Sequence, residues 1–419
     1  MTVFAKNFQQ IGTESAFAVG PEIAALEKQG YNIVRVNIGE PGSNIPRAST
    51  EALLKSVKNN ETHYAAPAGI DSLRQAIAEY LSKTRKVKYS AADIAMAPGG
   101  KPVICGTFFI LVNAGDEVVY PTPGYPIYES MANFVGAKAR PIVLKEEKGF
   151  RFDIKDLKKL INKKTKLLVL NSPSNPTGGV LEPEDYQEIA KLAKQYNFYI
   201  LADEIYSRVA FDKKMRQVSF CNSRVAITDS IVNQPGMAEK TVILDGFSKT
   251  YAMTGLRLGY AASQIPGFID KFITFAINFW SNLPVPCMRA AEAALRTNQT
   301  EAQREIKGYL EKRDMMVKAL NAINGISCHN PRGSFYLFPN VTKVCRELKL
   351  KDAEALRKYL LTYDKKNKKG VAVLARQHFG KKLAVEKEEY IRISIAGSRS
   401  SLKEAVKRIK EAVEPLGRD

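Results

Sequence analysis

The sequence predicts an α/β protein: a mostly parallel β-sheet between helices, with a smaller α+β lobe attached. Two observations support this class. Short apolar runs of β-forming residues stop at polar, glycine or proline residues, as buried parallel strands do, and helical patterns separate them. Towards the C-terminus the chain changes to longer helical patterns mixed with short apolar runs. The predicted core strands are 116–121, 166–173, 198–204 and 241–248.

Helical patterns between these strands complete a βαβ arrangement. The predicted helices are 101–113, 124–136 and 183–196. In sheets of this kind, ligands bind beyond the carboxyl ends of the strands. Asn171, Asp203 and Lys249 each follow a predicted apolar run closely. The sequence therefore predicts a binding site at this edge of the sheet.

The C-terminal part predicts the smaller lobe. It begins with a long amphipathic helical stretch around 287–323. Apolar runs at 333–341, 370–375 and 390–396 follow, together with helices near 352–361 and 400–415. We therefore expect three regions: residues 1–45 as an N-terminal segment that joins the small domain, 46–290 as the large domain, and 291–419 as a linking helix and the small domain.

The composition is that of an ordinary globular protein, with 45% hydrophobic and 25% charged residues among 419. The net charge of +20 is spread along the chain. No RNA-binding aromatic motif interleaves with the basic runs, so we expect no nucleic acid partner; a basic surface also steers anionic substrates. Five scattered cysteines without a C-x-x-C pair and three distant histidines predict neither a disulfide framework nor a metal site.

No apolar run reaches the roughly 18 residues of a membrane span. The N-terminus also lacks the apolar run of a signal peptide. These features predict a soluble protein of a reducing compartment, the cytoplasm, with no membrane partner.

Three short motifs lie at the predicted strand ends. Residues 171–178, N-S-P-S-N-P-T-G, predict a fixed loop, which alone would be a plain turn. Asp203 ends a strand in A-D-E-I-Y and needs a donor or a cation if it is buried, although a structural salt bridge would explain it alone. Lys249, in S-K-T, is placed to become a nucleophile towards an aldehyde. Arg257 adds a guanidinium whose paired N–H donors suit a phosphate. Alone, S-K-T is a weak motif, because most lysines lie on the surface.

Together these motifs resemble those of the class I/II aminotransferases, which are pyridoxal 5′-phosphate (PLP) enzymes of fold type I. S-x-N-P-T-G, A-D-E-I-Y and S-K-x-x-x-M-T-G-x-R occur in the family's order and spacing, and the resemblance spans roughly residues 15–415. The nearest subgroup is the bacterial-type (Iβ) aspartate aminotransferases. The resemblance implies a seven-stranded sheet in the large domain. Further matches are G-E-P at 39–41, Y-A-A-P-A-G-I at 64–70, G-D-E at 115–117 and R-I-S at 392–394.

The resemblance assigns roles around the cofactor. Lys249 would hold PLP as a Schiff base and later transfer the proton. Asp203 would pair with the pyridine nitrogen and so stabilise the quinonoid carbanion. Asn175 and Tyr206 would hydrogen-bond the 3′-oxygen, and Tyr125 would stack on the ring. The phosphate would lie at the start of a helix, bound by Gly100, Lys101, Pro102, Ser248 and Arg257.

The resemblance also implies how substrate and subunits bind. Arg392 would take the substrate α-carboxylate by a bidentate pair, near Asn175 and the backbone of Gly39. Tyr64 would reach the phosphate of the neighbouring subunit, so a homodimer is implied.

Three positions depart from the family's pattern. Gly246 stands where many relatives carry a serine, so one phosphate hydroxyl is absent. Lys101 stands where many subgroup members have a small polar residue. It either binds the distal carboxylate of an acidic substrate, as in some aspartate-using members, or adds a second phosphate contact. Residues 16–17 (Ala-Phe) fall where those members have a threonine that helps acidic substrates, which argues against aspartate.

The expected activity is ping-pong transfer of an amino group from an L-amino acid, aspartate-like favoured, to a 2-oxo acid such as 2-oxoglutarate. Aromatic amino acids or alanine are alternative donors. A carbon–sulfur β-lyase, a synthase or an oxidase on the same scaffold is an alternative that the cofactor motifs cannot separate. A PLP-sensing regulator would need a DNA-binding domain, for which the extent of the resemblance leaves no room. The complete set of site residues argues against a binding protein with a degenerate site.

Overall fold

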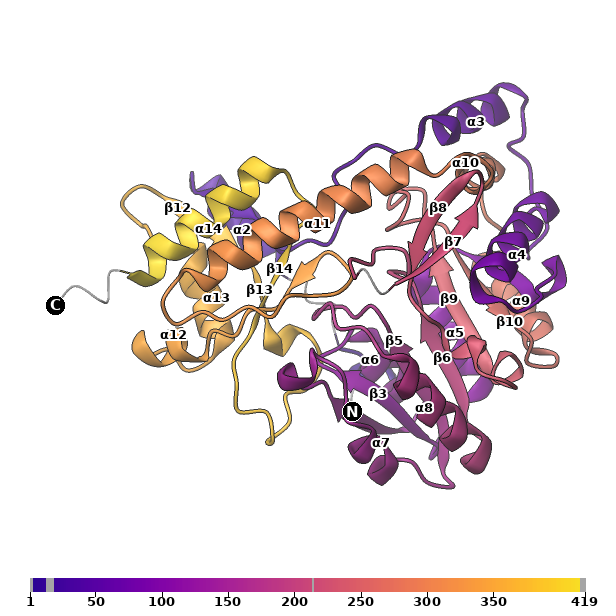
Figure 1. Ribbon diagram of the computed structural model, residues 1–419, viewed down its shortest axis with the longest axis horizontal. Coiled ribbons are helices and arrows are strands. Elements are labelled where there is room, and N and C mark those ends of the chain that lie inside the picture. The colour runs from indigo at the N-terminus through magenta and orange to yellow at the C-terminus, as the bar shows by residue number, and fades with distance from the viewer. Residues whose placement is uncertain (1–2, 13–18, 213–214, 415–419) are drawn as a thin grey trace.

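The computed structural model describes residues 3–12, 19–212 and 215–414, which form a large domain and a smaller lobe (Figure 1). A seven-stranded sheet in the order β2-β10-β9-β6-β5-β3-β4 forms the centre of the large domain. β10 runs antiparallel to both neighbours, and the other pairs are parallel. The predicted α/β class is therefore confirmed. The strands are β2 (Ile94–Ala97), β3 (Glu117–Thr122), β4 (Lys138–Val143), β5 (Thr165–Asn171), β6 (Tyr199–Asp203), β9 (Thr241–Gly246) and β10 (Gly259–Ser263).

The burial of each strand explains which ones the sequence predicts. β3, β5, β6 and β9 are buried along almost their whole length, and each lies within two residues of a predicted strand. β2 and β10 are equally buried but rich in alanine, a weak strand former, so the sequence does not predict them. β4 is an edge strand with Lys138, Arg140 and Pro141, a composition that protects sheet edges and hides the strand pattern.

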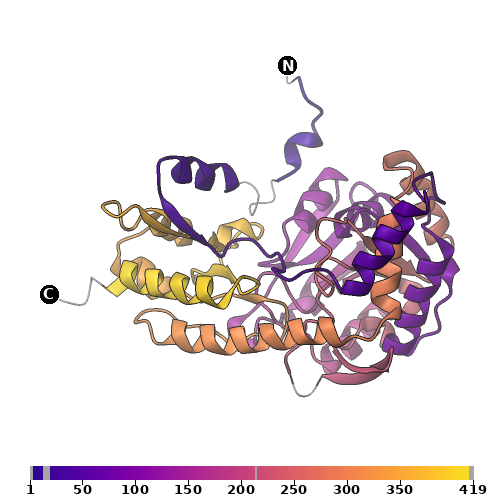
Figure 2. The same ribbon diagram turned by 90° about the horizontal axis from the view of Figure 1, so that it is seen from above.

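Helices pack on both faces of this sheet (Figure 2). Helix α8 matches the predicted helix 183–196, and its first turn has a capping box made by Glu182 and Asp185. Helix α6 begins only at Ile127, so Tyr125 lies on the preceding loop and not in the helix predicted from residue 124. The helices of this domain are α3 (Arg47–Lys58), α4 (Asp71–Arg85), α5 (Gly100–Leu111), α6 (Ile127–Phe134), α7 (Ile154–Leu160), α8 (Pro183–Tyr196), α9 (Phe268–Phe279) and α10 (Val285–Arg296).

The smaller lobe holds a three-stranded antiparallel sheet, β11-β14-β13, with its own hydrophobic core. A parallel pair joins β1 (Asn32–Arg35) to β12 (Lys369–Ala372), so the N-terminal segment lies against the C-terminal part of the chain. The residue boundaries predicted for the three regions stay predictions. The other elements here are α2 (Gly20–Lys28), α11 (Thr300–Asn321), β11 (Tyr336–Leu337), α12 (Thr342–Glu347), α13 (Ala353–Leu361), β13 (Leu374–Ala375), β14 (Ile391–Ser394) and α14 (Arg399–Val413).

The helical stretch predicted around 287–323 is two helices, α10 and α11, and not one. Gln299 explains the break. Its side-chain amide donates to the carbonyls of Ala294 (3.0 Å) and Thr297 (2.8 Å), which satisfies the open end of α10. Its oxygen accepts from Arg208 (2.6 Å) and Tyr251 (2.8 Å) in the large domain. The joint between the helices is therefore fixed by a buried side chain.

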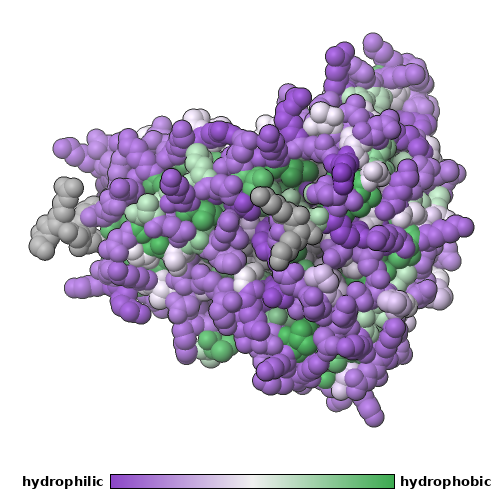
Figure 3. Space-filling view, in the orientation of Figure 1, coloured by the Kyte–Doolittle hydropathy of each residue, from purple (hydrophilic) through white to green (hydrophobic). Residues whose placement is uncertain are grey.

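The remaining elements lie at the periphery. A hairpin joins β7 (Arg216–Phe220) to β8 (Ser223–Ile227). The face drawn in Figure 3 is mainly hydrophilic, with scattered hydrophobic side chains. Among the helices that the structure describes, none is long and apolar enough to cross a bilayer. Short 3-10 helices occur at Phe8–Gln10, Ala91–Asp93, Glu146–Lys148, Ile231–Asn233, Ala238–Lys240 and Arg376–His378.

Candidate active site

A cavity of ≈ 560 Å³ lies at the carboxyl ends of β5, β6 and β9, between the large domain and the smaller lobe. Its position is the one that the sheet topology predicts for a ligand site. Eleven of the thirteen residues predicted for the site line it; Pro102 and Tyr64 do not. The eleven are Gly39, Gly100, Lys101, Tyr125, Asn175, Asp203, Tyr206, Ser248, Lys249, Arg257 and Arg392.

Lys249 lies on the turn that follows β9 and projects into the cavity. Its ammonium donates a 2.7 Å hydrogen bond to the carbonyl of Gly39 and lies 5.6 Å from the centre of the Phe335 ring. Gly39 comes from the N-terminal segment. The cavity thus joins residues that are 210 positions apart in the chain.

Asp203 is the last residue of β6 and is buried. Tyr128, on α6, donates a 2.6 Å hydrogen bond to its carboxylate, and the backbone N–H of Ile205 lies 3.3 Å from it. Burial raises the pKa of Asp203 to about 6, and the Tyr128 hydrogen bond opposes that rise. A cation placed in the cavity would stabilise the ionised form of this carboxylate. No motif in the sequence marks Tyr128, although it lies only three residues after Tyr125.

The start of α5 provides an anion site. Its first residues, Gly100 and Lys101, line the cavity together with Arg257 and Ser248. Free N–H groups and the helix dipole favour an anion at such a helix start. Gly99, before the helix, has φ +91°, and a Cβ there would lie 2.5 Å from a guanidinium nitrogen of Arg257. The close approach of Arg257 therefore requires the glycine.

Gly246, where relatives carry a serine, lies at the end of β9 against β10. A Cβ at this position would lie 2.8 Å from the carbonyl oxygen of Leu258 and 2.9 Å from Cα of Gly259. Both neighbours are backbone atoms, which cannot move aside as a side chain does. A serine at position 246 would therefore not fit unless the backbone of β10 moved.

Arg392, on β14, closes the cavity from the smaller lobe. Its guanidinium is buried, lies over the rings of Tyr336 (4.2 Å) and Phe379 (4.9 Å), and donates to Asn175 Oδ1 (2.9 Å) and to the carbonyl of Asn37. Its Nε is buried and has no hydrogen-bond partner within the described residues. Arg392 lines the cavity, and a guanidinium offers N–H donors in the geometry that suits a carboxylate.

Tyr336, on β11, is a site residue that the sequence analysis did not identify. Its hydroxyl lies 3.0 Å from that of Tyr206, and burial together with this neighbour raises the pKa of Tyr206 well above its ordinary value. A Cβ on Gly39 would lie 1.8 Å from the Tyr336 hydroxyl, so Gly39 cannot carry a side chain. Only the run G-S-F-Y marks this residue in the sequence, and it has no feature of a site motif.

Two predicted residues lie elsewhere. Pro102 is in the first turn of α5, outside the cavity lining. Tyr64 is 92% exposed on the loop between α3 and α4. Residues 16–17, expected near an acidic substrate, lie outside the described residues.

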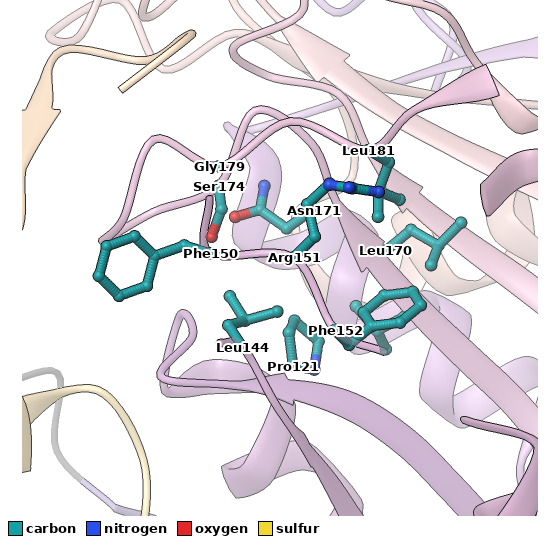
Figure 4. A pocket seen from close by; sticks show the side chains of 11 residues that line it. Pro121, Leu144, Phe150, Arg151, Phe152, Leu170, Asn171, Ser174, Gly179 and Leu181 are labelled. Atoms are coloured by element: carbon teal, nitrogen blue, oxygen red, sulfur yellow. The ribbon is translucent and has the colours of Figure 1, made fainter. Parts of the chain in front are cut away.

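A second, much smaller cavity of ≈ 10 Å³ lies below the loop that carries Asn175. Figure 4 shows Asn171 and Ser174 beside apolar side chains such as Leu144, Phe152 and Leu170. This volume holds about one water molecule and no substrate.

The larger cavity fits the cofactor that the resemblance implies. Asp203 offers a buried carboxylate for a protonated ring nitrogen, Lys249 offers an amine for an aldehyde, and the start of α5 with Arg257 suits a phosphate.

Comparison with known proteins gives the same family over the whole chain. A family model described as aminotransferase class I and II matches residues 31–409. The aspartate aminotransferase of Bacillus subtilis is 30% identical over 411 residues, which covers 98% of this chain and 98% of that protein. The solved structure of the aspartate aminotransferase from Rhizobium meliloti has a TM-score of 0.88 at 27% identity, with 99% of both chains covered. That of alanine aminotransferase from Pyrococcus furiosus has a TM-score of 0.87 at 25% identity and covers 98% of this chain and 100% of that one.

Proposed function

Because the chain belongs to the class I and II aminotransferase family, and is therefore a PLP-dependent transaminase, we propose that its donor is an acidic L-amino acid, aspartate first. The acceptor would be a 2-oxo acid such as 2-oxoglutarate, and the two half-reactions would follow each other by a ping-pong mechanism. The family and its cofactor match the resemblance found in the sequence.

The observation that carries the proposal is the excess of cations in the cavity. Four basic residues (Lys101, Lys249, Arg257 and Arg392) line it against two acidic ones, Glu40 and Asp203. Glu40 is exposed and accepts a 2.6 Å hydrogen bond from Thr254. If Arg257 takes the phosphate and Arg392 the α-carboxylate, Lys101, which lines the same cavity, would meet the distal carboxylate of an acidic substrate.

The apolar part of the lining favours a second candidate. Ile38, Ile104 and Ile205 line the same cavity, with Tyr125. Such a wall suits an aromatic or aliphatic side chain, so an aromatic amino acid or alanine is the alternative donor. In that case Lys101 would serve the phosphate.

When bound, PLP supplies an electron-withdrawing ring that accepts the electron pair of the Cα–H bond. Asp203 would hold a proton at the ring nitrogen, and Tyr128 would keep that carboxylate in place. Lys249 would hold the cofactor covalently and, once its amine is free, take the proton from Cα. Gly39, whose carbonyl already accepts from Lys249, would keep the amine directed into the cavity.

Arg392 would orient the substrate. Asn175 and the carbonyl of Asn37 fix its outer nitrogens, and from this position the guanidinium would pair with the substrate carboxylate. The rings of Tyr336 and Phe379 set the plane of the guanidinium, and so the plane of the bound carboxylate.

We also propose a homodimer in which Tyr64 enters the partner's site. Support comes from exposure: Tyr64 is 92% exposed in one subunit, and exposed apolar side chains that group together mark an interaction surface. Leu54 and Val57 on the adjoining helix α3 are exposed as well, 53% and 50%. Sedimentation equilibrium of the wild type and of a Tyr64→Ser variant tests this proposal. A wild-type monomer at micromolar concentration with full activity contradicts it.

The donor is tested by replacing Lys101 with methionine, which keeps the length of the side chain and removes its charge. Loss of a charged hydrogen bond costs about 1.5–3 kcal/mol, so kcat/KM for aspartate should fall about ten- to a hundredfold. The value for alanine or phenylalanine should change little. Lys164→Met, at an exposed lysine remote from the cavity, is the matched control. An equal loss for all donors, with weaker PLP binding, would instead assign Lys101 to the phosphate.

A product assay separates transamination from the lyase and synthase alternatives. Incubation with aspartate and 2-oxoglutarate should yield glutamate without free ammonia. Release of ammonia or pyruvate without glutamate would refute aminotransfer as the main reaction.

A further inference from the structure

Residues 376–390, which we call the strap, connect β13 to β14 and cross from the smaller lobe to the large domain. Two backbone contacts mark the crossing. The carbonyl of Phe379 accepts from the N–H of Gly124 (3.0 Å), and the N–H of Lys381 donates to Glu129 (2.9 Å). Gly124 precedes Tyr125, so the strap is bonded to the loop that carries the predicted ring-stacking residue.

Arg376 organises the strap from a fully buried position. Its Nε and Nη2 each lie 2.8 Å from an oxygen of Glu386, which forms a bidentate ion pair across the strap. Nη1 donates to the carbonyl of Gly380 (3.0 Å). Nη2 also donates to the hydroxyl of Thr122 (2.8 Å), the last residue of β3 in the large domain. One guanidinium therefore joins both halves of the strap to a strand end of the central sheet.

The strap also determines where Phe379 lies. This ring is buried, lies over the Arg392 guanidinium at 4.9 Å, and makes an edge contact with Phe338. The carbonyl of the same residue holds Gly124. Phe379 thus contacts the predicted carboxylate-binding arginine through its side chain and the Tyr125 loop through its backbone.

We propose that Arg376 is a positioning residue for transamination. Through the strap it keeps Arg392, in the smaller lobe, in register with the Tyr125 loop, in the large domain. A substrate held by its carboxylate on one lobe must meet a cofactor held on the other, so a small error in this register misplaces the reacting atoms. The proposal rests on the roles proposed above for Arg392 and Tyr125.

The Arg376–Glu386 ion pair alone would not indicate a role in catalysis, because buried ion pairs occur in many folds. The bond to Thr122 suggests a functional role, because among the hydrogen bonds described for Arg376 it is the one that crosses between the lobes. Thr122→Val removes that acceptor, keeps the size of the side chain, and leaves the Arg376–Glu386 pair intact.

We expect Thr122→Val holoenzyme to bind maleate, an unreactive dicarboxylate, about tenfold more weakly, which is less than the roughly hundredfold cost of a misplacement of about 1 Å. Binding is read from the change in cofactor absorbance on titration, without turnover. KM for the amino donor should rise by a similar factor and kcat should fall less. The melting temperature should fall by about a few degrees, because one buried hydrogen bond is lost. Thr274→Val, which removes an exposed hydroxyl bonded to the backbone of α9, is the matched control and should bind maleate normally.

A second variant covers the ion pair itself. Arg376→Met with Glu386→Leu replaces the pair by apolar side chains and leaves no buried charge unpaired. If this double variant folds and both it and Thr122→Val bind maleate as the wild type does, the proposal is overturned.

Arg392→Gln in the same titration separates this inference from the proposed function. Unchanged maleate binding in Arg392→Gln would overturn the carboxylate role of Arg392 and the strap proposal with it. A large loss in Arg392→Gln, with no loss in the strap variants, would overturn the strap proposal alone.

Discussion

Replacing Asp203 with asparagine should make the cofactor-free protein more stable while it removes transamination. Asp203 is fully buried, and burial raises its pKa to about 6 from an ordinary value of 3.8. The folded protein therefore holds this proton more tightly than the unfolded chain does. The stability linked to that proton is present below pH 3.8 and is lost as the pH rises through about 6.

The size of the effect follows from the two pKa values. Because the pKa is raised from 3.8 to about 6, the unfolding free energy at pH 8 is lower by about 3 kcal/mol than at a pH below 3.8. At pH 5 about half of this loss has developed. Asparagine does not titrate and still offers an oxygen to the Tyr128 hydroxyl. The unfolding free energy of the variant should therefore not fall with pH through this group. The gain in stability should therefore widen by about 1 kcal/mol between pH 5 and pH 8.

Urea unfolding of the apoprotein at pH 5 and pH 8 measures this difference, with Asp270→Asn on the first turn of α9 as a control. A stability difference between wild type and Asp203→Asn that does not change with pH would refute the reasoning. PLP should stabilise the wild type more than the variant, because only the wild type offers an ionised carboxylate to the ring nitrogen. Equal stabilisation of both would contradict that pairing.

Three further predictions concern single positions. Lys249→Ala should abolish turnover, and borohydride treatment of the wild-type holoenzyme should fix the cofactor on Lys249; a peptide map with the label elsewhere would disprove the assignment. Arg85→Met should lower the unfolding free energy by about 3–5 kcal/mol, because it leaves Glu204, 2.6 Å away and buried, without its cation; urea titration gives the value, and adding Glu204→Leu should restore much of it. Gly246→Ser should cost about 1–3 kcal/mol, since its Cβ meets backbone atoms at 2.8 and 2.9 Å; an unchanged melting temperature would show that β10 can move.

The sequence predicts the parts of the fold that rest on strong local patterns. The four central strands follow from apolar runs within a short window, and α8 follows from the helical pattern between two of them. The antiparallel strand β10 escapes prediction because Gly-Tyr-Ala-Ala-Ser has little strand propensity, and only its pairing with β2 and β9 makes it a strand. The break between α10 and α11 escapes for a similar reason, because Gln299 acts through contacts with Arg208 and Tyr251, which are remote in the chain.

The residues of the candidate site likewise fall into those that a local sequence pattern marks and those that it does not. Asn175, Asp203 and Lys249 lie at strand ends or in motifs, where sequence reasoning can find them. Tyr128 and Tyr336 act by touching other site residues, and their neighbours in sequence give no sign of it. Phe379 and Arg376 belong to the same group. Supporting residues of this kind become visible only once the pairing of distant elements is known.

The order of strands in the central sheet has a consequence for biosynthesis. β2 leaves the ribosome first among the seven strands, but its only partner in the sheet is β10, and Ala97 pairs with Gly259, 162 residues later. At about 5–20 residues per second, the ribosome needs about 8–32 seconds to deliver that partner. β1 waits longer still, because Asn32 pairs with Lys369. We therefore expect the nascent chain to expose the apolar segment Ile94–Ala97 until β10 has been made, and to complete the cavity only after Arg392, on β14, has been made.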